Sequence, residues 1–153
     1  MRALFSIATL SAVISAIGNP VDVSSYSNIN EIHTSHVHLN LDVSFDKRQL
    51  SGVASHTMKV VKPSVKSAFF DIVGIDVSAA LIGQGSLFYQ AQYRVSSPRP
   101  KLGDALEVDI PECFRNGKDL TINITYATNE KQTATSWMTK EQTACGTLEY
   151  LYT

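Results

Sequence analysis

The strictest constraint on this chain is an alternation of polar and apolar residues that begins at His36 and ends at Asp46. Apolar side chains occupy the odd positions from Val37 to Phe45, and polar side chains occupy the even positions. Successive side chains of a β-strand point to opposite faces, so this period of two predicts a strand with one buried and one solvated face. An α-helix would scatter the same residues around its axis. The segment therefore indicates sheet structure.

Further strands are expected along the rest of the chain, separated by turn residues. The predicted strands span residues 50–61, 67–73, 77–82, 87–95, 106–110, 120–126 and 148–153. The segments 96–104 and 128–147 are predicted to be loops. No segment shows the apolar period of an amphipathic helix. The sequence therefore predicts an all-β fold, either an antiparallel β-sandwich or an open barrel.

The first 18 residues are typical of a secretory signal. A positive charge at Arg2 precedes an uncharged run, Ala3–Ile17, which is shorter than the roughly 20 residues of a membrane-spanning helix. An uncleaved anchor and a buried N-terminal helix are the alternatives. We expect a signal peptide over residues 1–18, a polar leader over 19–35 and a β-domain over 36–153. The mature chain should then be extracellular and free of the membrane.

Composition narrows the classes of partner. The net charge is −1 and the 13 Lys and Arg residues are scattered, which argues against nucleic-acid binding. Two cysteines, Cys113 and Cys145, are too few for a disulfide-built scaffold, and an oxidising compartment would permit a bridge between them without requiring it. Asn123 opens an N-glycosylation sequon and is predicted on the polar face of its strand, with an unused sequon as the alternative.

Metal and catalytic motifs are sparse. His36 and His38 point to one face of the first strand and could share a metal, with a third ligand from His33, His56 or Asp42. The competing interpretation is a pair of solvated or packed histidines. None of the four histidines is followed by Glu, so no H-E-x-x-H occurs, and G-x-S-x-G and C-x-x-C are also absent from the sequence. We assign no catalytic, metal or substrate-binding residue.

Two segments carry a family resemblance. Residues 135–143, Thr-Ser-Trp-Met-Thr-Lys-Glu-Gln-Thr, followed by Glu-Tyr-Leu-Tyr at 149–152, resemble the W-L-T-P-E-Q-T…P-Y-L-F stretch of aminopeptidase N type zinc metallopeptidases, in the leukotriene A-4 hydrolase branch. The first strand and the Arg48-Gln49-Leu50-Ser51-Gly52 segment after it resemble the first hairpin of that family. Lys140 stands where the family usually has Pro. Trp137, the single tryptophan, is interpreted as a packing residue.

The resemblance implies a saddle-like N-terminal β-domain that packs over a thermolysin-like catalytic domain. It also implies release of N-terminal residues from peptides by a zinc-bound water, with zinc held by two His and one Glu. Those motifs lie downstream of the matched region in the family. We therefore expect a non-catalytic, C-terminally incomplete domain without its own zinc, whose partner is the catalytic domain and which meets peptides only in the full-length enzyme. The alternative is a free-standing secreted β-sandwich that binds a partner and has no enzymatic activity.

Overall fold

The computed structural model describes residues 24–117 and 119–153, so the predicted signal peptide lies outside the described residues. None of the helical segments within that part of the chain is long and apolar enough to cross a membrane. Its regular elements are strands joined by loops and 3₁₀ turns. In chain order they are β1 (Ile32–Ser44), β2 (Gln49–Val60), β3 (Ser67–Ile72), β4 (Ile75–Gln84), β5 (Leu87–Gln90), β6 (Tyr93–Ser96), η1 (Pro100–Leu102), β7 (Asp104–Asp109), η2 (Glu112–Phe114), β8 (Asp119–Thr128), β9 (Ser136–Met138), η3 (Lys140–Gln142) and β10 (Tyr150–Tyr152).

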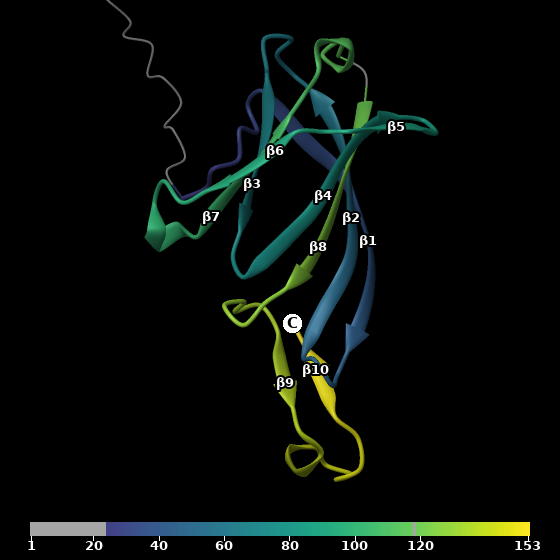
Figure 1. The fold of residues 1–153 in the computed structure, drawn as a ribbon, viewed down its shortest axis with the longest axis vertical. Helices are drawn as coiled ribbons and strands as arrows, with labels where there is room; N and C mark the ends of the chain where they lie inside the picture. Colours follow the sequence, from purple (N-terminus) through teal and green to yellow (C-terminus); the bar gives the residue numbers. More distant parts are fainter. Residues whose placement is uncertain (1–23, 118) are drawn as a thin grey trace, which may run out of the picture.

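The strands form three antiparallel sheets (Figure 1). A five-stranded sheet has the order β1-β2-β8-β4-β5, and a three-stranded sheet has the order β3-β7-β6. A small sheet pairs β9 with β10 beyond one end of the other two. The prediction of an all-β antiparallel fold is confirmed.

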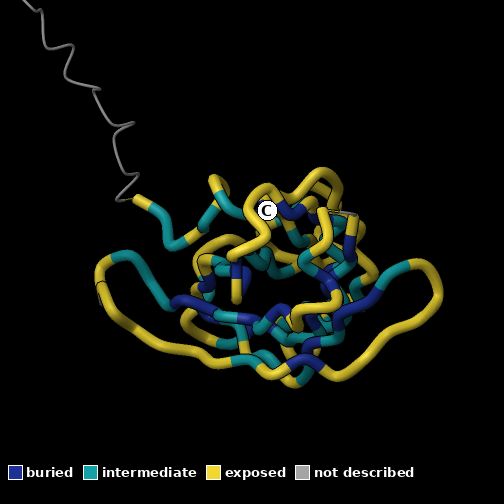
Figure 2. The backbone as a smooth tube through the Cα atoms, turned by 90° about the horizontal axis from the view of Figure 1, so that it is seen from above, coloured by how far each residue is buried: buried dark blue, intermediate teal, exposed yellow. Residues whose placement is uncertain are grey.

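The core lies between the five-stranded and three-stranded sheets. On β8, Leu120, Ile122 and Ile124 alternate with polar residues and are at most 5% exposed. Leu106 and Val108 of β7 face them from the other sheet and are fully buried. Figure 2 shows the buried segments inside and the exposed loops arching outward. Removing these apolar side chains from water supplies the main stabilisation of the sandwich.

The first strand starts earlier than its alternation suggests. β1 begins at Ile32, which is 1% exposed. The prediction of a polar leader is therefore wrong for residues 32–35. The preceding residues pack along β3. Asn28 donates from Nδ2 to the Ser67 carbonyl at 2.9 Å and accepts the Phe69 amide on Oδ1 at 3.2 Å. The Asn28 side chain thus satisfies backbone hydrogen-bonding groups of β3, which lies at the edge of its sheet. A contact of this kind leaves no apolar period in the sequence.

Two other segments differ from the prediction. Residues 87–95 form two strands in different sheets, because the chain crosses over at Ala91, which is 3% exposed and donates its amide to the Ala80 carbonyl. The region 128–147 contains β9 and η3 as well as loops. Both departures involve strands of three or four residues, which are too short for periodicity to mark.

Candidate functional site

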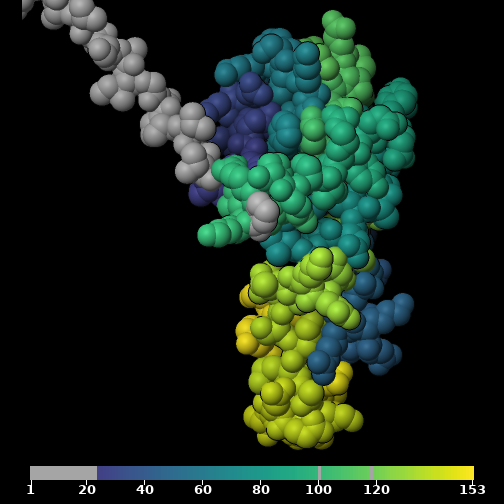
Figure 3. Space-filling model, turned by 60° about the vertical axis from the view of Figure 1, so that its left-hand side comes forward, coloured from purple at the N-terminus to yellow at the C-terminus, as the bar shows by residue number. Residues whose placement is uncertain are grey.

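The segment that carries the family motif forms a separate hairpin. Residues 136–152, here called the C-terminal hairpin, pair Tyr150 with Met138 and Leu151 with Trp137. In Figures 1 and 3 this hairpin projects from one end of the sandwich. The motif therefore lies on a protruding element and not in the core.

An aromatic contact joins the C-terminal hairpin to the sandwich. The ring of Trp137 meets that of Phe45, in the β1–β2 turn, edge to face with 5.5 Å between centroids. Trp137 is half-buried, and its Nε1 atom has no hydrogen-bond partner within the part of the chain that the structure describes. This geometry agrees with the interpretation of Trp137 as a packing residue.

The Glu-Gln-Thr part of the motif shapes the turn between β9 and β10. Thr139 and Gln142 form a capping box around η3, in which the Gln142 side chain accepts the Thr139 amide at 2.9 Å. The Thr143 Oγ1 atom lies 2.8 Å from the Lys140 carbonyl oxygen and 3.0 Å from the Leu148 carbonyl oxygen, so its one hydrogen is shared between these two acceptors. The side chains of the motif residues Gln142 and Thr143 thus form hydrogen bonds with the backbone of this turn.

Large side chains at the end of the C-terminal hairpin are exposed. Leu148 is 70% exposed, Tyr150 57% and Tyr152 51%. Aromatic residues with one apolar face and a polar tip are enriched at protein interfaces. The protruding hairpin therefore offers a contact surface.

The two cysteines do not form a bridge. Both are free and exposed. Cys113 lies in η2, after β7, whereas Cys145 lies in the loop between β9 and β10, and Figure 1 shows these segments at opposite ends of the molecule. A disulfide needs Cα atoms within about 7 Å, so the structure does not bring the pair together.

Cys145 has a stabilised thiolate that the sequence did not indicate. The Thr147 hydroxyl donates to its Sγ at 3.3 Å, and the Thr147 and Leu148 amides add to this. These hydrogen bonds lower the pKa of the Cys145 thiol to about 6. The thiol is exposed on the β9–β10 loop and is open to reagents in solution.

The histidines do not assemble a metal site. His36 and His38 pair with Thr57 and Ser55 of β2 on the outer face of the large sheet, while His56 lies opposite Val37 on the inner face. The His56 ring packs against Phe70 at 4.8 Å between centroids, and burial lowers its pKa. Among residues 24–117 and 119–153 no three His, Cys, Asp or Glu side chains are close enough to hold a metal. The described residues therefore do not support the metal site suggested by His36 and His38.

Asn123 lies in the middle of β8, between Ser55 of β2 and Leu81 of β4. It is on the face opposite the buried isoleucines, as predicted, but the side chain is only partly exposed. Its Oδ1 atom is buried and has no hydrogen-bond partner among the described residues. Glycosylation at Asn123 stays a prediction.

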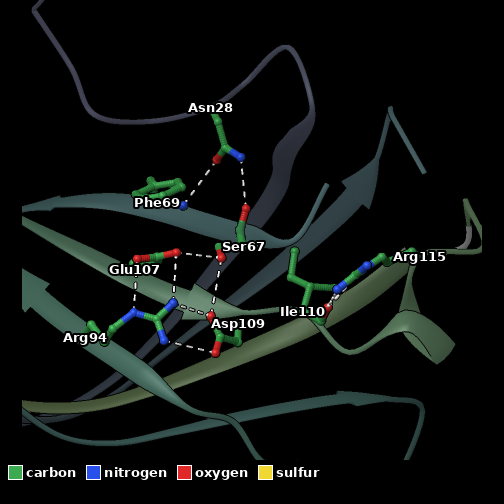
Figure 4. A network of polar contacts seen from close by, with 8 residues as sticks. All are labelled: Asn28, Ser67, Phe69, Arg94, Glu107, Asp109, Ile110 and Arg115. Atoms are coloured by element: carbon green, nitrogen blue, oxygen red, sulfur yellow. Dashed lines mark hydrogen bonds and ion pairs between the residues drawn. The ribbon is translucent and has the colours of Figure 1, made fainter. Parts of the chain in front are cut away.

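A polar network covers the outer face of the three-stranded sheet (Figure 4). Arg94 of β6 contacts Glu107 at 3.0 Å and Asp109 at 2.7 Å, both on β7, and Ser67 of β3 donates to Glu107 at 2.7 Å. Hydrogen bonds from Arg94 and then Ser67 lower the pKa of Glu107. The alternation in residues 106–110 indicates that the two acidic residues share the polar face of their strand. Their pairing with Arg94 is not indicated by any local pattern, because it depends on the crossover at Ala91. The charges of Arg94, Glu107 and Asp109 are paired with one another, so the network links three strands.

An apolar hollow lies at the other end of the sandwich from the C-terminal hairpin. It measures about 520 Å³ and is lined by Gln84, Leu87, Tyr89, Pro111, Cys113 and Phe114. No base or acid among these residues could activate the Cys113 thiol. The residues that line the hollow therefore offer no general base for a cysteine nucleophile.

The sequence of this chain is similar to sequences of known aminopeptidases and hydrolases. No protein-family profile matches the chain. It is 28% identical to leucine aminopeptidase 2 of Ajellomyces capsulatus, covering 88% of this chain and 21% of that protein. It is 25% identical to leukotriene A-4 hydrolase of Xenopus laevis, covering 86% of this chain and 21% of the relative. The chain thus spans about a fifth of the length of the relatives it matches.

The fold agrees with the same proteins. Yeast LTA4 hydrolase in complex with bestatin superposes with a TM-score of 0.75 and 26% identity, covering 90% of this chain and 21% of that one. The native yeast enzyme gives the same TM-score over 89% of this chain. The homologues of this chain are leucine aminopeptidase 2 and leukotriene A-4 hydrolase, and its β-sandwich is that of the N-terminal β-domain of LTA4 hydrolase.

Proposed function

We propose that this chain is the non-catalytic N-terminal β-domain of a zinc metallo-aminopeptidase similar to leukotriene A-4 hydrolase. The observation that carries the proposal is the superposition of 90% of the chain on about a fifth of yeast LTA4 hydrolase. The remaining four-fifths of that enzyme lie outside the aligned region. We infer that they contain its catalytic part.

The C-terminal hairpin supports a role beside a peptide-binding cleft. Its exposed Tyr150 and Tyr152 and the neighbouring Leu148 provide apolar area that a second domain would cover. The contact of Trp137 with Phe45 holds this surface against the sandwich, and the capping box at Thr139 orders the turn of the hairpin itself. In this proposal the chain positions the wall of a cleft and contributes no reacting group.

Zinc chemistry would come from the catalytic part. A zinc ion there would polarise a peptide carbonyl and activate a water. The described residues of this chain offer no ligand set for it. Their share of the function is to bind the catalytic part, to exclude water from the shared surface and to limit the peptides that can enter.

Association in trans tests this role. Yeast LTA4 hydrolase that lacks the region homologous to this chain is titrated with residues 19–153 of this chain, and complex formation is followed by calorimetry together with turnover of an aminoacyl reporter. We expect a complex and a rise in turnover, both weakened by the double substitution Tyr150→Ser and Tyr152→Ser. Tyr89→Ser is the matched control, since Tyr89 is similarly exposed at 59% but lies on β5. A monodisperse chain without affinity for the catalytic part would favour the free-standing binding module instead.

We also propose that the chain is secreted. The uncharged run after Arg2 supports this, because a short apolar segment behind a positive charge is what the secretory translocon accepts. Expression in a secreting host and N-terminal sequencing of the protein in the medium should give a chain that starts at Asn19. Retention of intact Met1 inside the cell would contradict secretion.

A further inference from the structure

The turn between η2 and β8 places an asparagine directly before a glycine. Asn116 and Gly117 are both exposed and lie between Phe114, where η2 ends, and Asp119, where β8 begins. Gly117 has a φ of 75°, in the left-handed region that residues with a Cβ atom disfavour. A Cβ atom built there would meet nothing within 4 Å beyond its chain neighbours. The backbone conformation, and not a lack of space, therefore explains the glycine.

This pair of residues suits attack of the Gly117 backbone nitrogen on the side-chain amide of Asn116. The nitrogen and the Cγ atom belong to adjacent residues and close a five-membered ring, so they react as neighbours held together. Glycine carries no Cβ atom that would hinder their approach. The Gly117 amide donates no hydrogen bond within residues 24–117 and 119–153, so no such bond has to break first.

The other asparagines of the sequence each precede a residue that carries a side chain. Asn129 is the closest comparison, because it also lies in a loop, directly after β8. Its Nδ2 atom donates to Asp76 at 2.7 Å, and its Oδ1 atom accepts the Lys131 amide at 3.0 Å. Both ends of this side-chain amide are held, and the Glu130 side chain hinders ring closure. Asn129 is therefore an internal control for Asn116.

We propose that Asn116 is a modification site at which the side-chain amide is lost through a cyclic imide formed with Gly117. The Gly117 nitrogen gives up its proton and bonds to the Asn116 Cγ atom. The bond from Cγ to Nδ2 then breaks, and Nδ2 takes up a proton and leaves as ammonia. Water opens the ring at either carbonyl carbon, which gives aspartate or isoaspartate, so one water is consumed for each ammonia released. The reaction takes place within two adjacent residues, needs no partner and does not rest on the scaffold role proposed above.

Loss of the amide changes a contact between this turn and η2. Asn116 donates from Nδ2 to the Cys113 carbonyl at 3.3 Å. An ionised carboxylate has no hydrogen to donate, so the modification replaces this donor by an acceptor. The Phe114 and Arg115 amides, which donate to the Pro111 and Glu112 carbonyls at 3.0 Å, close η2. We expect these two amides to exchange with solvent faster once Asn116 is modified.

Peptide mapping by mass spectrometry tests the site on the purified chain after incubation at mildly alkaline pH. The peptide that contains Asn116 should gain the mass difference between OH and NH₂, while the peptide that contains Asn129 stays unchanged. The gain should be faster at higher pH, because the attacking nitrogen must lose its proton. Asn116→Gln keeps an amide but would have to close a larger ring, so it should abolish the gain. No gain at Asn116, or equal gains at Asn116 and Asn129, would overturn the proposal.

Two variants test the attacking group and the effect on η2. Gly117→Ala leaves Asn116 in place but adds a Cβ atom beside the attacking nitrogen, and should slow the gain several-fold. Circular dichroism checks that this variant is folded, because its φ is strained. A wild-type rate in Gly117→Ala would exclude Gly117 as the attacking residue. Asn116→Asp removes the donor directly, and should speed hydrogen exchange at Phe114 and Arg115 but not at Ile122 in β8. Unchanged exchange at the two η2 amides would contradict the effect on η2.

Discussion

Replacing Leu120 by Ala measures how much the contact between the two sheets contributes to stability. Leu120 lies on β8, in the middle of the five-stranded sheet, and is 1% exposed. The change removes the Cγ and both Cδ atoms. At about 0.8 kcal/mol for each buried carbon, the lost transfer free energy is about 2.4 kcal/mol, and the cavity adds roughly 1 kcal/mol. We expect the free energy of unfolding to fall by about 3 kcal/mol.

Urea unfolding followed by circular dichroism measures this loss. The midpoint should fall while the dependence on urea stays constant, since the same surface is exposed on unfolding. Leu87→Ala is the control, because Leu87 is 66% exposed on the same sheet and should cost less than about 0.5 kcal/mol. A loss below about 1 kcal/mol at Leu120, or equal losses at both positions, would refute the description of the core.

Three further outcomes follow from the contacts. Burial lowers the pKa of His56 below its ordinary 6.5, so the unfolded chain binds the proton more readily. The free energy of unfolding should therefore fall as pH drops through 6.5, and His56→Phe should remove this dependence in urea titrations. The pKa of Cys145, about 6, predicts alkylation by iodoacetamide that is already near its maximal rate at neutral pH, with Cys145→Ser removing the fast phase and leaving Cys113. Phe45→Ala removes the edge-to-face partner of Trp137 and should loosen the C-terminal hairpin, seen as faster hydrogen exchange in residues 136–152 with unchanged exchange in β8.

Long alternating strands could be predicted from the sequence because their two faces meet different surroundings. The alternations from Val37 to Phe45 and from Leu120 to Tyr126 both correspond to strands of the large sheet. Burial follows in β8, where Ile122 is fully buried, but not in β1, where Leu39 is 55% exposed. Periodicity therefore identifies the strand and the face, and the neighbouring sheet decides whether that face is covered.

The remaining features depend on contacts between distant residues. Asn28 supports β3 through hydrogen bonds to Ser67 and Phe69, which no local pattern marks. The thiolate environment of Cys145 comes from the tight turn that contains Thr147, and amide directions in a turn cannot be read from residue types. The motif with Trp137 is visible in the sequence, but its structural role depends on the contact with Phe45, which no local pattern marks.

The zinc content of the purified chain, together with its turnover of an aminoacyl reporter, tests most directly whether the reactive part of the proposed enzyme lies outside this chain. We expect substoichiometric zinc and no turnover above buffer. One zinc per chain, with turnover that a chelator abolishes and added zinc restores, would contradict it.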